Sequence, residues 1–165
     1  MSDFHIIESE RGQFPIILPP QERANWDTWG FPRVMIMTPR LILDGVNKGG
    51  FKLMAGDGYF LPIYLKTNYK EKVKQGAGEG EGHVRIDRKG EVEFYLYTTS
   101  EGFGYATEAV EGVKFFMKQK NVEPYLRILD NNLKSQNVAK RTKFVAGEAT
   151  FVNGKPAKFY HLEDF

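Results

Sequence analysis

Residues 91–109, EVEFYLYTTSEGFGYATEA, decide the fold of this chain. Residues 91–98 alternate between polar and apolar side chains, which predicts a half-buried strand. A turn with two glycines, Gly102-Phe-Gly104, follows and leads into residues 105–120, where apolar side chains recur at helical spacing. A strand that passes through glycines into a helix presents unpaired N–H groups that suit a pyrophosphate, although a plain strand-to-helix turn can need the same glycines.

The flanking sequence predicts an α/β fold with a mixed sheet and flanking helices. Before the central segment, 34–43 predicts a strand pair or one bent strand, 59–66 a strand that Pro62 favours at a sheet edge, and 83–88 a hairpin partner for 91–98. After it come a strand at 125–129, a short helix at 133–142, and a hairpin of 148–152 with 157–162 around Asn153-Gly154. The step from Glu91 to Leu129 is a β-α-β crossover unit.

The N-terminal residues 1–33 differ from the rest because four prolines interrupt them. We expect an irregular arm, with a short strand or docking segment near 14–18, packed on a single domain of residues 34–165. Trp26, Trp29 and Phe31 are too many large apolar groups for a free tail, and they could also contribute to a homodimer interface. The tract from Gly76 to Gly82 predicts a flexible loop.

Composition narrows the function classes. The 165 residues include no cysteine, which excludes disulfides, thiolate metal sites and a cysteine nucleophile. A net charge of +2 is too small to indicate nucleic-acid binding, and the lysine run 66–74 is better explained as a solvated edge. His5, His83 and His161 have no metal-binding spacing, so we expect no metal. The sequence shows no membrane span and no signal peptide, so we expect a soluble, cytoplasmic protein with no membrane partner.

Three segments resemble the GNAT superfamily of N-acetyltransferases, especially its RimJ/RimL-like members. Gly102-Phe-Gly-Tyr-Ala-Thr-Glu-Ala109 is similar to the family's GxGYATEA segment. Asn132-Leu-Lys-Ser135 and the residues up to Phe144 are similar to its NxxSxxVxEKxGF segment, and Thr38-Pro-Arg-Leu-Ile-Leu43 is similar to its opening TxRLxLR strand. The resemblance covers about half of the chain, from His83 to Leu162. It implies a GNAT-like acyl-CoA N-acyltransferase fold and acetyl-coenzyme A (acetyl-CoA) as the cofactor.

The resemblance also implies a set of cofactor-binding residues. Backbone amides of the glycine loop and the first helical turn would hold the pyrophosphate, the end of the strand would pair with the pantetheine arm, Asn132 would hydrogen-bond that arm, and a basic residue would reach the phosphates. These residues are Leu96, Tyr97, Thr98, Gly102, Phe103, Gly104, Tyr105, Ala106, Asn132, Lys140 and Arg141.

The catalytic candidates are Glu93, Glu91 and Ser135. A strand carboxylate could take the amine proton through a water, and Glu93 is the preferred base because it is nearer the expected point of strand separation. Two solvated strand glutamates are the alternative interpretation. The family's tyrosine acid corresponds to Ala139 here, which leaves Ser135, directly or through a water, as the proton donor; a helix-start hydrogen bond is its alternative role.

Three departures from the family pattern keep rival functions open. Thr99 stands where a Gln or Arg is usual, Lys143 replaces a Gly, and the region of the first two helices is short and Gly-rich. The first hypothesis is an acetyl-CoA-dependent N-acetyltransferase that acts on an amine of a protein or small molecule by direct attack. The alternatives are a catalytically degenerate GNAT-fold binding or inhibitory protein and, with less support, a GNAT-fold enzyme that modifies nucleic acid.

Overall fold

The computed structural model describes residues 4–9, 33–45, 58–74, 80–87 and 89–165. Most of the arm lies outside these residues, including the segment near 14–18 and Trp26, Trp29 and Phe31. The region 46–57, where the family's first helices are expected, lies outside them too.

The larger sheet has six strands, and their spatial order is their order in the chain. Every neighbouring pair is antiparallel, so short turns can connect the strands. The strands are β1 (His5–Ser9), β2 (Arg33–Met37), β3 (Leu41–Asp44), β4 (Gly58–Leu65), β5 (Gly82–Asp87) and β6 (Val92–Leu96).

The smaller sheet comes from the C-terminal end of the chain, in the order β7-β9-β8. Its strands are β7 (Tyr125–Leu129), β8 (Phe144–Val152) and β9 (Lys155–Leu162). Asn153 and Gly154 both have positive φ, 51° and 77°, as the two-residue turn of a tight hairpin requires. A register shift between Ala146 and Ala149 interrupts the pairing of β8 with β9.

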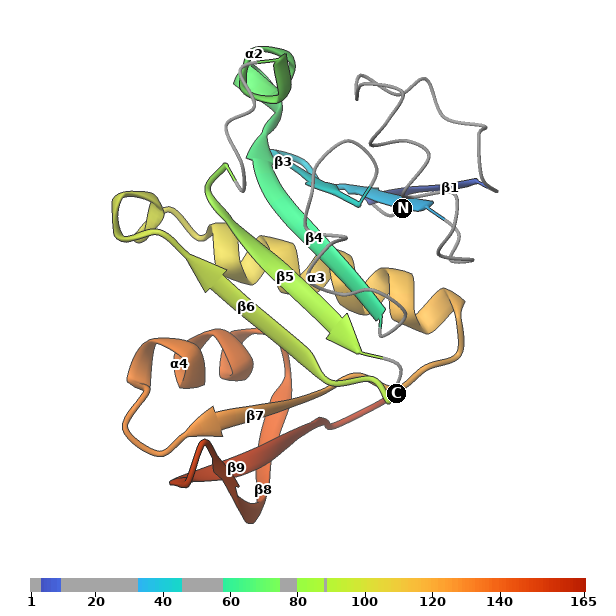
Figure 1. Ribbon diagram of the computed structural model, residues 1–165. Coiled ribbons are helices and arrows are strands. Elements are labelled where there is room, and N and C mark those ends of the chain that lie inside the picture. Colours follow the sequence, from blue (N-terminus) through green and yellow to red (C-terminus); the bar gives the residue numbers. More distant parts are fainter. Residues whose placement is uncertain (1–3, 10–32, 46–57, 75–79, 88) are drawn as a thin grey trace.

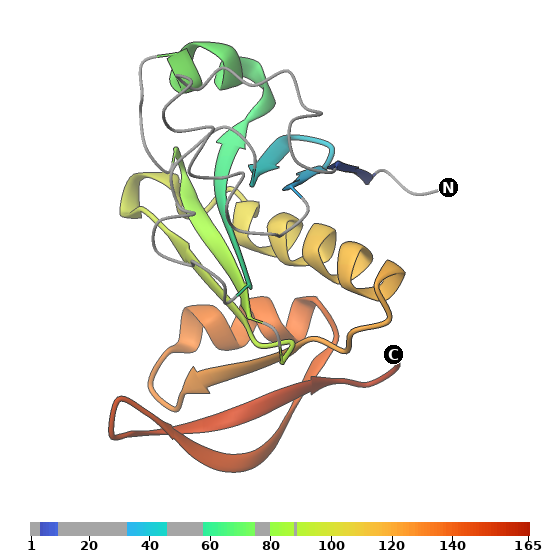
Figure 2. The same cartoon turned by 45° about the vertical axis from the view of Figure 1, so that its right-hand side comes forward.

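Two longer helices accompany the sheets. Helix α3 (Tyr105–Gln119) lies across one face of the larger sheet, and α4 (Leu133–Arg141) packs against the smaller one (Figures 1 and 2). Gly112 allows α3 to approach closely, because a Cβ there would lie 2.9 Å from Cγ2 of Thr38 and 3.1 Å from Cγ2 of Ile36. Short helical turns are η2 (Lys66–Asn68), α2 (Tyr69–Lys74) and η3 (Thr98–Ser100).

The core lies between α3 and the larger sheet. Val34, Ile36, Leu41, Leu43 and Leu61 are fully buried on the sheet side, and Ala109, Val110, Val113, Phe116 and Met117 are buried on the helix side. These helical positions have the three- and four-residue spacing of one face, so the apolar period in the sequence is the cause of the packing. None of the described helices is long and apolar enough to span a membrane.

The two sheets meet where β6 and β7 begin. An isolated parallel bridge joins Glu91 to Tyr125, and the Tyr125 N–H donates to the Gly90 carbonyl at 3.0 Å. Beyond this bridge the strands separate, and Figure 1 shows β6 and β7 close together at one end and apart at the other, with α4 on the open side. The β6–α3–β7 crossover therefore creates a V-shaped gap whose apex is the Glu91–Tyr125 bridge.

The sequence predicted the α/β class, the β5–β6 hairpin, α3, β7, α4 and the C-terminal hairpin. Three expectations need correction. The arm is not wholly irregular, because β1 lies in it and pairs with β2. Strand β4 is central rather than at an edge. Its pairing with β3 stops at Ile63, so Pro62 has no partner on β3; on the other side, Pro62 is opposite His83 of β5. Strand β8 begins at Phe144, earlier than the predicted residue 148.

Candidate functional site

A cavity of about 530 Å³ lies on the open side of the V, between the end of β6, the start of α3 and the start of α4. Residues from two GNAT-like segments, the one that begins at Gly102 and the one that begins at Asn132, therefore line the same cavity. The lining residues are Phe94, Tyr95, Leu96, Glu101, Gly102, Gly104, Tyr105, Ala106, Thr107, Asn132, Lys134, Ser135, Asn137, Val138 and Arg141.

The glycine loop forms one wall of this cavity. Gly102 and Gly104 have φ of 88° and 79°, a conformation that favours glycine. A Cβ on Gly102 would have no heavy atom of the described chain within 4 Å, so packing does not require the missing side chain there. The N–H groups of the first turn of α3, from Tyr105 onward, have no partner within the helix. The loop and helix start thus form a surface on which an anion can approach the backbone closely.

The exposed edge of β6 forms a second wall. In an antiparallel strand, alternate residues direct their backbone groups to opposite edges. The Tyr97 N–H donates to the Glu81 carbonyl and the Glu91 carbonyl accepts from Asp87, so the odd-numbered residues face β5. The backbone groups of Phe94 and Leu96 consequently face the gap toward β7.

The resemblance implied that Leu96, Tyr97 and Thr98 all contact the cofactor, but the structure gives them different environments. Leu96 lines the cavity and has its backbone at the open edge. Tyr97 is engaged elsewhere, because its N–H donates to Glu81 and its carbonyl accepts from Ser100. The Thr98 carbonyl accepts from Glu101, within the turn η3. Phe94, which the sequence analysis missed, takes their place at the edge.

Helix α4 supplies the third wall through its first turn. Asn132 is the N-cap, and its Oδ1 accepts from the Ser135 N–H at 3.1 Å. The helix-start hydrogen bond considered for Ser135 is therefore made by the Asn132 side chain and the Ser135 backbone, while residue Ser135 lines the cavity. Of the two basic candidates at the end of α4, Arg141 is among the described lining residues and Lys140 is not.

Three charged residues are part of the cavity lining: Glu101, Lys134 and Arg141. Lys134 Nζ lies 2.8 Å from a carboxylate oxygen of Glu101, which connects α4 to the residue before Gly102. Lys134 is exposed, so this pair contributes little to stability. With Arg141 also on the lining, the described cavity carries two cations and one carboxylate. This balance favours an anionic ligand. The sequence analysis did not name Lys134, although its position inside the segment Asn132–Ser135 could have indicated it.

Glu91 is fixed at the apex of the V. It is 9% exposed, and its carboxylate oxygens lie 3.0 and 3.2 Å from Nε of Arg127 on β7. Arg127 also donates to the Phe151 carbonyl at 3.1 Å. Burial raises the pKa of the neighbouring Tyr125, and the charges of Asp87 and Glu91 raise it further. Glu91 thus links the two sheets, a role that sequence spacing could not show.

Glu93 lies two residues farther along the strand from Glu91. It pairs with Arg85 on β5, with Nη1 and Oε2 separated by 3.5 Å, and both side chains are about half exposed. Glu93 shares a strand face with Tyr95, which lines the cavity and lies about 7 Å away along the strand. Among the described lining residues Glu93 itself is absent. It is near the cavity but is directed to Arg85.

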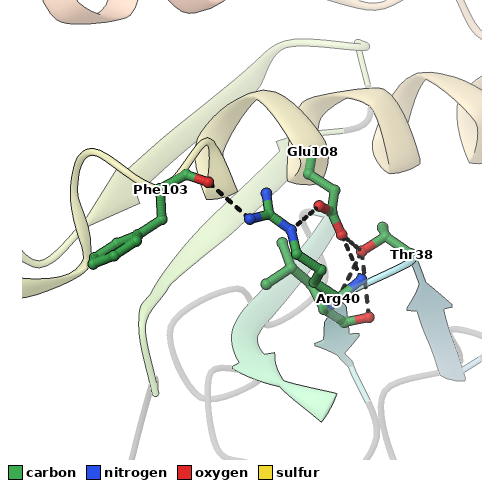
Figure 3. Close-up of polar contacts among 5 residues, drawn as sticks. Thr38, Arg40, Phe103 and Glu108 are labelled. Carbon is green, nitrogen blue, oxygen red and sulfur yellow. Dashed lines mark hydrogen bonds and ion pairs between the residues drawn. The ribbon is translucent and has the colours of Figure 1, made fainter. Parts of the chain in front are cut away.

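Phe103 does not line the cavity in the described residues, although its two glycine neighbours do. Its ring is 57% exposed and stacks on Tyr105 at 5.4 Å between centroids. Its carbonyl accepts from Arg40 (Figure 3), which is not among the described lining residues. The described chain also contains no cluster of three His, Cys, Asp or Glu side chains able to hold a metal ion.

Comparison with known proteins supports the same fold. No family model and no curated protein sequence matches this chain. Among solved structures, a Bordetella pertussis protein described as a GnaT-family acetyltransferase is similar, with 15% identity, a TM-score of 0.58, and coverage of 78% of this chain and 98% of the other. An acetyltransferase from Agrobacterium tumefaciens has 20% identity, a TM-score of 0.55, and coverage of 77% and 94%.

A third similar structure is RimL, described as a ribosomal L7/L12 α-N-protein acetyltransferase in complex with coenzyme A. It has 14% identity, a TM-score of 0.50, and coverage of 66% of this chain and 64% of the other. At such identities the likeness establishes the fold alone. The chain has the α/β fold of the GNAT acetyltransferases, as its sequence motifs predicted.

Proposed function

We propose that this protein is an acetyl-CoA-dependent N-acetyltransferase that acts on an amine of a protein or small molecule. The observation that carries the proposal is the cavity at the open side of the V. It combines a helix N-terminus behind two glycines of positive φ, an open strand edge, and the cations Lys134 and Arg141. A GNAT-type fold with these features suits a long ligand that has phosphates at one end and amide groups along its length.

Each wall offers a different kind of contact to such a ligand. The N–H groups from Gly104 to Ala106 would bind the pyrophosphate, with Arg141 and Lys134 adding positive charge. The backbone of Phe94 and Leu96 would pair with the amides of the pantetheine arm as an added strand does. Asn132 uses Oδ1 for its cap, so its Nδ2 group is the part that would donate to the ligand.

The reaction needs proton transfers that the chain must provide. When bound, the acetyl thioester supplies an acyl carbon whose C–S bond breaks as a C–N bond forms, and one proton passes overall from the amine to the sulfur. Ser135 lines the cavity, and its hydroxyl would deliver the proton at the sulfur, directly or through a water. Glu93 would accept the amine proton through a water after leaving Arg85, an exchange that its exposure permits.

The test is a turnover assay with purified protein. Coenzyme A released from acetyl-CoA is followed with a thiol reagent, and the protein gives no background because the chain contains no cysteine. A peptide N-terminus is the first acceptor to test, since one similar structure is described as an α-N-protein acetyltransferase. Ser135→Ala should lower kcat while leaving the dissociation constant for coenzyme A unchanged. Failure of the wild type to bind coenzyme A in calorimetry would overturn the proposal.

A binding protein without turnover is the second candidate, and one observation favours it. Both strand glutamates are paired with arginines, and the carboxylate on the described cavity lining, Glu101, is paired with Lys134. No described lining residue is therefore an unpaired carboxylate or an imidazole that could act as a base. Micromolar coenzyme A binding with no thiol release across peptide, lysine and polyamine acceptors would favour this candidate.

A further inference from the structure

Arg40 connects the opening segment of the domain to the glycine loop. It lies in the bend between β2 and β3. Its guanidinium makes two directional contacts: Nε donates to Glu108 Oε1 at 2.6 Å, and Nη1 donates to the Phe103 carbonyl at 2.9 Å. The guanidinium carbon lies 4.9 Å from the centre of the Tyr105 ring. Arg40 thus contacts the residues on both sides of Gly104, and Figure 3 shows its hydrogen bonds to Phe103 and Glu108.

Glu108 is the anchor of this arrangement. Its side chain is 13% exposed, and its second oxygen, Oε2, accepts from the Arg40 backbone N–H at 2.7 Å and from Thr38 Oγ1 at 2.5 Å. Burial of this carboxylate by itself raises its pKa, but the hydrogen bonds from Thr38 and Arg40 and the Arg40 charge outweigh burial, so the pKa lies below its ordinary value. Glu108 is therefore ionised at neutral pH and fixes the guanidinium at the start of α3.

The glycine loop needs such a restraint. Gly102 and Gly104 both have positive φ, and glycine loses more conformational freedom on folding than any other residue. Gly104 is the N-cap of α3, yet it offers no side-chain cap. Packing does not hold Gly102 either, since the position of its missing Cβ is open. Phe103 lies between these two glycines, and the hydrogen bond from Arg40 to its carbonyl restrains the loop.

We propose that Arg40, anchored by Glu108 and Thr38, is a positioning residue that holds the Gly102–Gly104 loop in its anion-binding conformation. This inference rests on the proposed coenzyme A site. In the described chain Arg40 does not line the cavity, whereas Gly102 and Gly104 do, so its effect on a ligand passes through the loop. Two of the segments that resemble GNAT motifs, Thr38–Leu43 and Gly102–Ala109, are thereby parts of one structural unit.

The positioning role of Arg40 depends on the two N–H donors that the planar guanidinium holds in fixed directions, rather than on its charge. Nε and Nη1 reach two acceptors in fixed directions, whereas a lysine ammonium is a single point charge on a flexible stem. Arg40→Lys keeps the charge near the loop but can satisfy one of the two acceptors at a time. The variant therefore separates positioning from simple electrostatic attraction, which Lys would preserve. Arg40→Ala removes both the positive charge and the two hydrogen bonds.

The experiment measures coenzyme A affinity by calorimetry for the wild type, Arg40→Lys, Arg40→Ala and the control Lys158→Gln. Lys158, on β9 of the smaller sheet, forms an exposed ion pair with Asp130, which follows β7, and it is not among the described lining residues of the cavity, so its variant should bind as the wild type does. If the competent loop falls to about a tenth of the population, the apparent dissociation constant rises about tenfold. We expect this rise for Arg40→Lys as well as Arg40→Ala. Wild-type affinity in Arg40→Lys would overturn the inference.

Amide hydrogen exchange gives a readout that does not need the ligand. Arg40→Lys should speed exchange at residues 102–107 while the amides of β7 and β9 keep wild-type protection. Unchanged exchange at 102–107 would overturn the positioning role. Should the wild type fail to bind coenzyme A, the proposed function is refuted, and the exchange result alone then decides whether Arg40 holds the loop. Arg40→Lys also covers the case in which Arg40→Ala does not fold.

Discussion

Asn132 caps α4 and, in our proposal, also binds the ligand, and a pair of substitutions can separate these two roles. Its Oδ1 caps α4 by accepting from the Ser135 N–H at 3.1 Å, and the residue is part of the cavity lining. Asn132→Ala removes both the cap and the Nδ2 donor. Asn132→Ser restores a cap, because Ser and Asn are about equally good N-cap residues, but it cannot extend an amide donor into the cavity.

The loss of the cap and the loss of the Nδ2 donor have different expected magnitudes. Removal of an N-cap costs about 1 kcal/mol of folding free energy, which is about 2–4 °C in Tm for a domain of this size. Loss of one hydrogen bond to the ligand costs about 1 kcal/mol of binding free energy, or about fivefold in Kd. We therefore expect Asn132→Ala to lose Tm and affinity, and Asn132→Ser to lose affinity alone.

Differential scanning fluorimetry without ligand measures the first quantity, and calorimetric titration with coenzyme A measures the second. The comparison that decides is between Asn132→Ser and the wild type. Equal Kd values for these two proteins would refute the assignment of Nδ2 to the ligand. A Tm for Asn132→Ala equal to that of the wild type would refute the capping role.

The remaining predictions concern charge, packing and backbone conformation. Glu101→Gln should tighten coenzyme A binding about fivefold and steepen its salt dependence, because it removes a negative charge beside the anion site and releases Lys134; weaker binding would show that the pair positions Lys134. Gly112→Ala should lower the free energy of unfolding in urea by up to about 2 kcal/mol, since overpacking outweighs the better helix propensity; a more stable variant would contradict the close packing of α3. Lys143→Gly should raise Tm without changing Kd, because Lys143 has a φ of 71°; a lower Tm would mean that its side chain contributes more than the backbone costs. The pKa of Glu108 is lowered from 4.5, so its contribution to stability should be complete above that pH and lost as pH falls through the lower folded value; a urea-stability difference from Glu108→Gln that already shrinks between pH 7 and 5.5 would contradict this.

Local patterns accounted for most of the fold. The apolar period of α3, the alternation of β5 and β6, and the Asn153-Gly154 turn each specify a conformation over a few residues, and the structure has all of them. Strand β1 was missed because its apolar run, Ile6-Ile7, is short and the arm that follows it contains four prolines. The central place of β4 was missed because Pro62 normally indicates an edge, and here the pairing with β3 ends beside it.

The site was harder to predict because its decisive contacts join distant parts of the chain. The glycine loop, Leu96, Asn132, Ser135 and Arg141 were identified from motifs, and the structure brings them to one cavity. The pairing of Glu91 with Arg127 spans 36 residues, and that of Arg40 with Glu108 spans 68. No local pattern reports such pairs, so Glu91 was interpreted as a candidate base.

The bridge between Glu91 and Tyr125 has a consequence for the ligands that the gap can accept. Beyond it, the five residues of β6 provide about 17 Å of strand edge before the turn that leads to the glycine loop. The strands are joined at one end of this edge and the glycine loop, our proposed anion site, follows the other, so the position of the bridge limits the length of ligand that fits. A ligand held by its phosphates can extend only until the strands close. Moving the bridge by two residues along the strands would change that limit by about 7 Å.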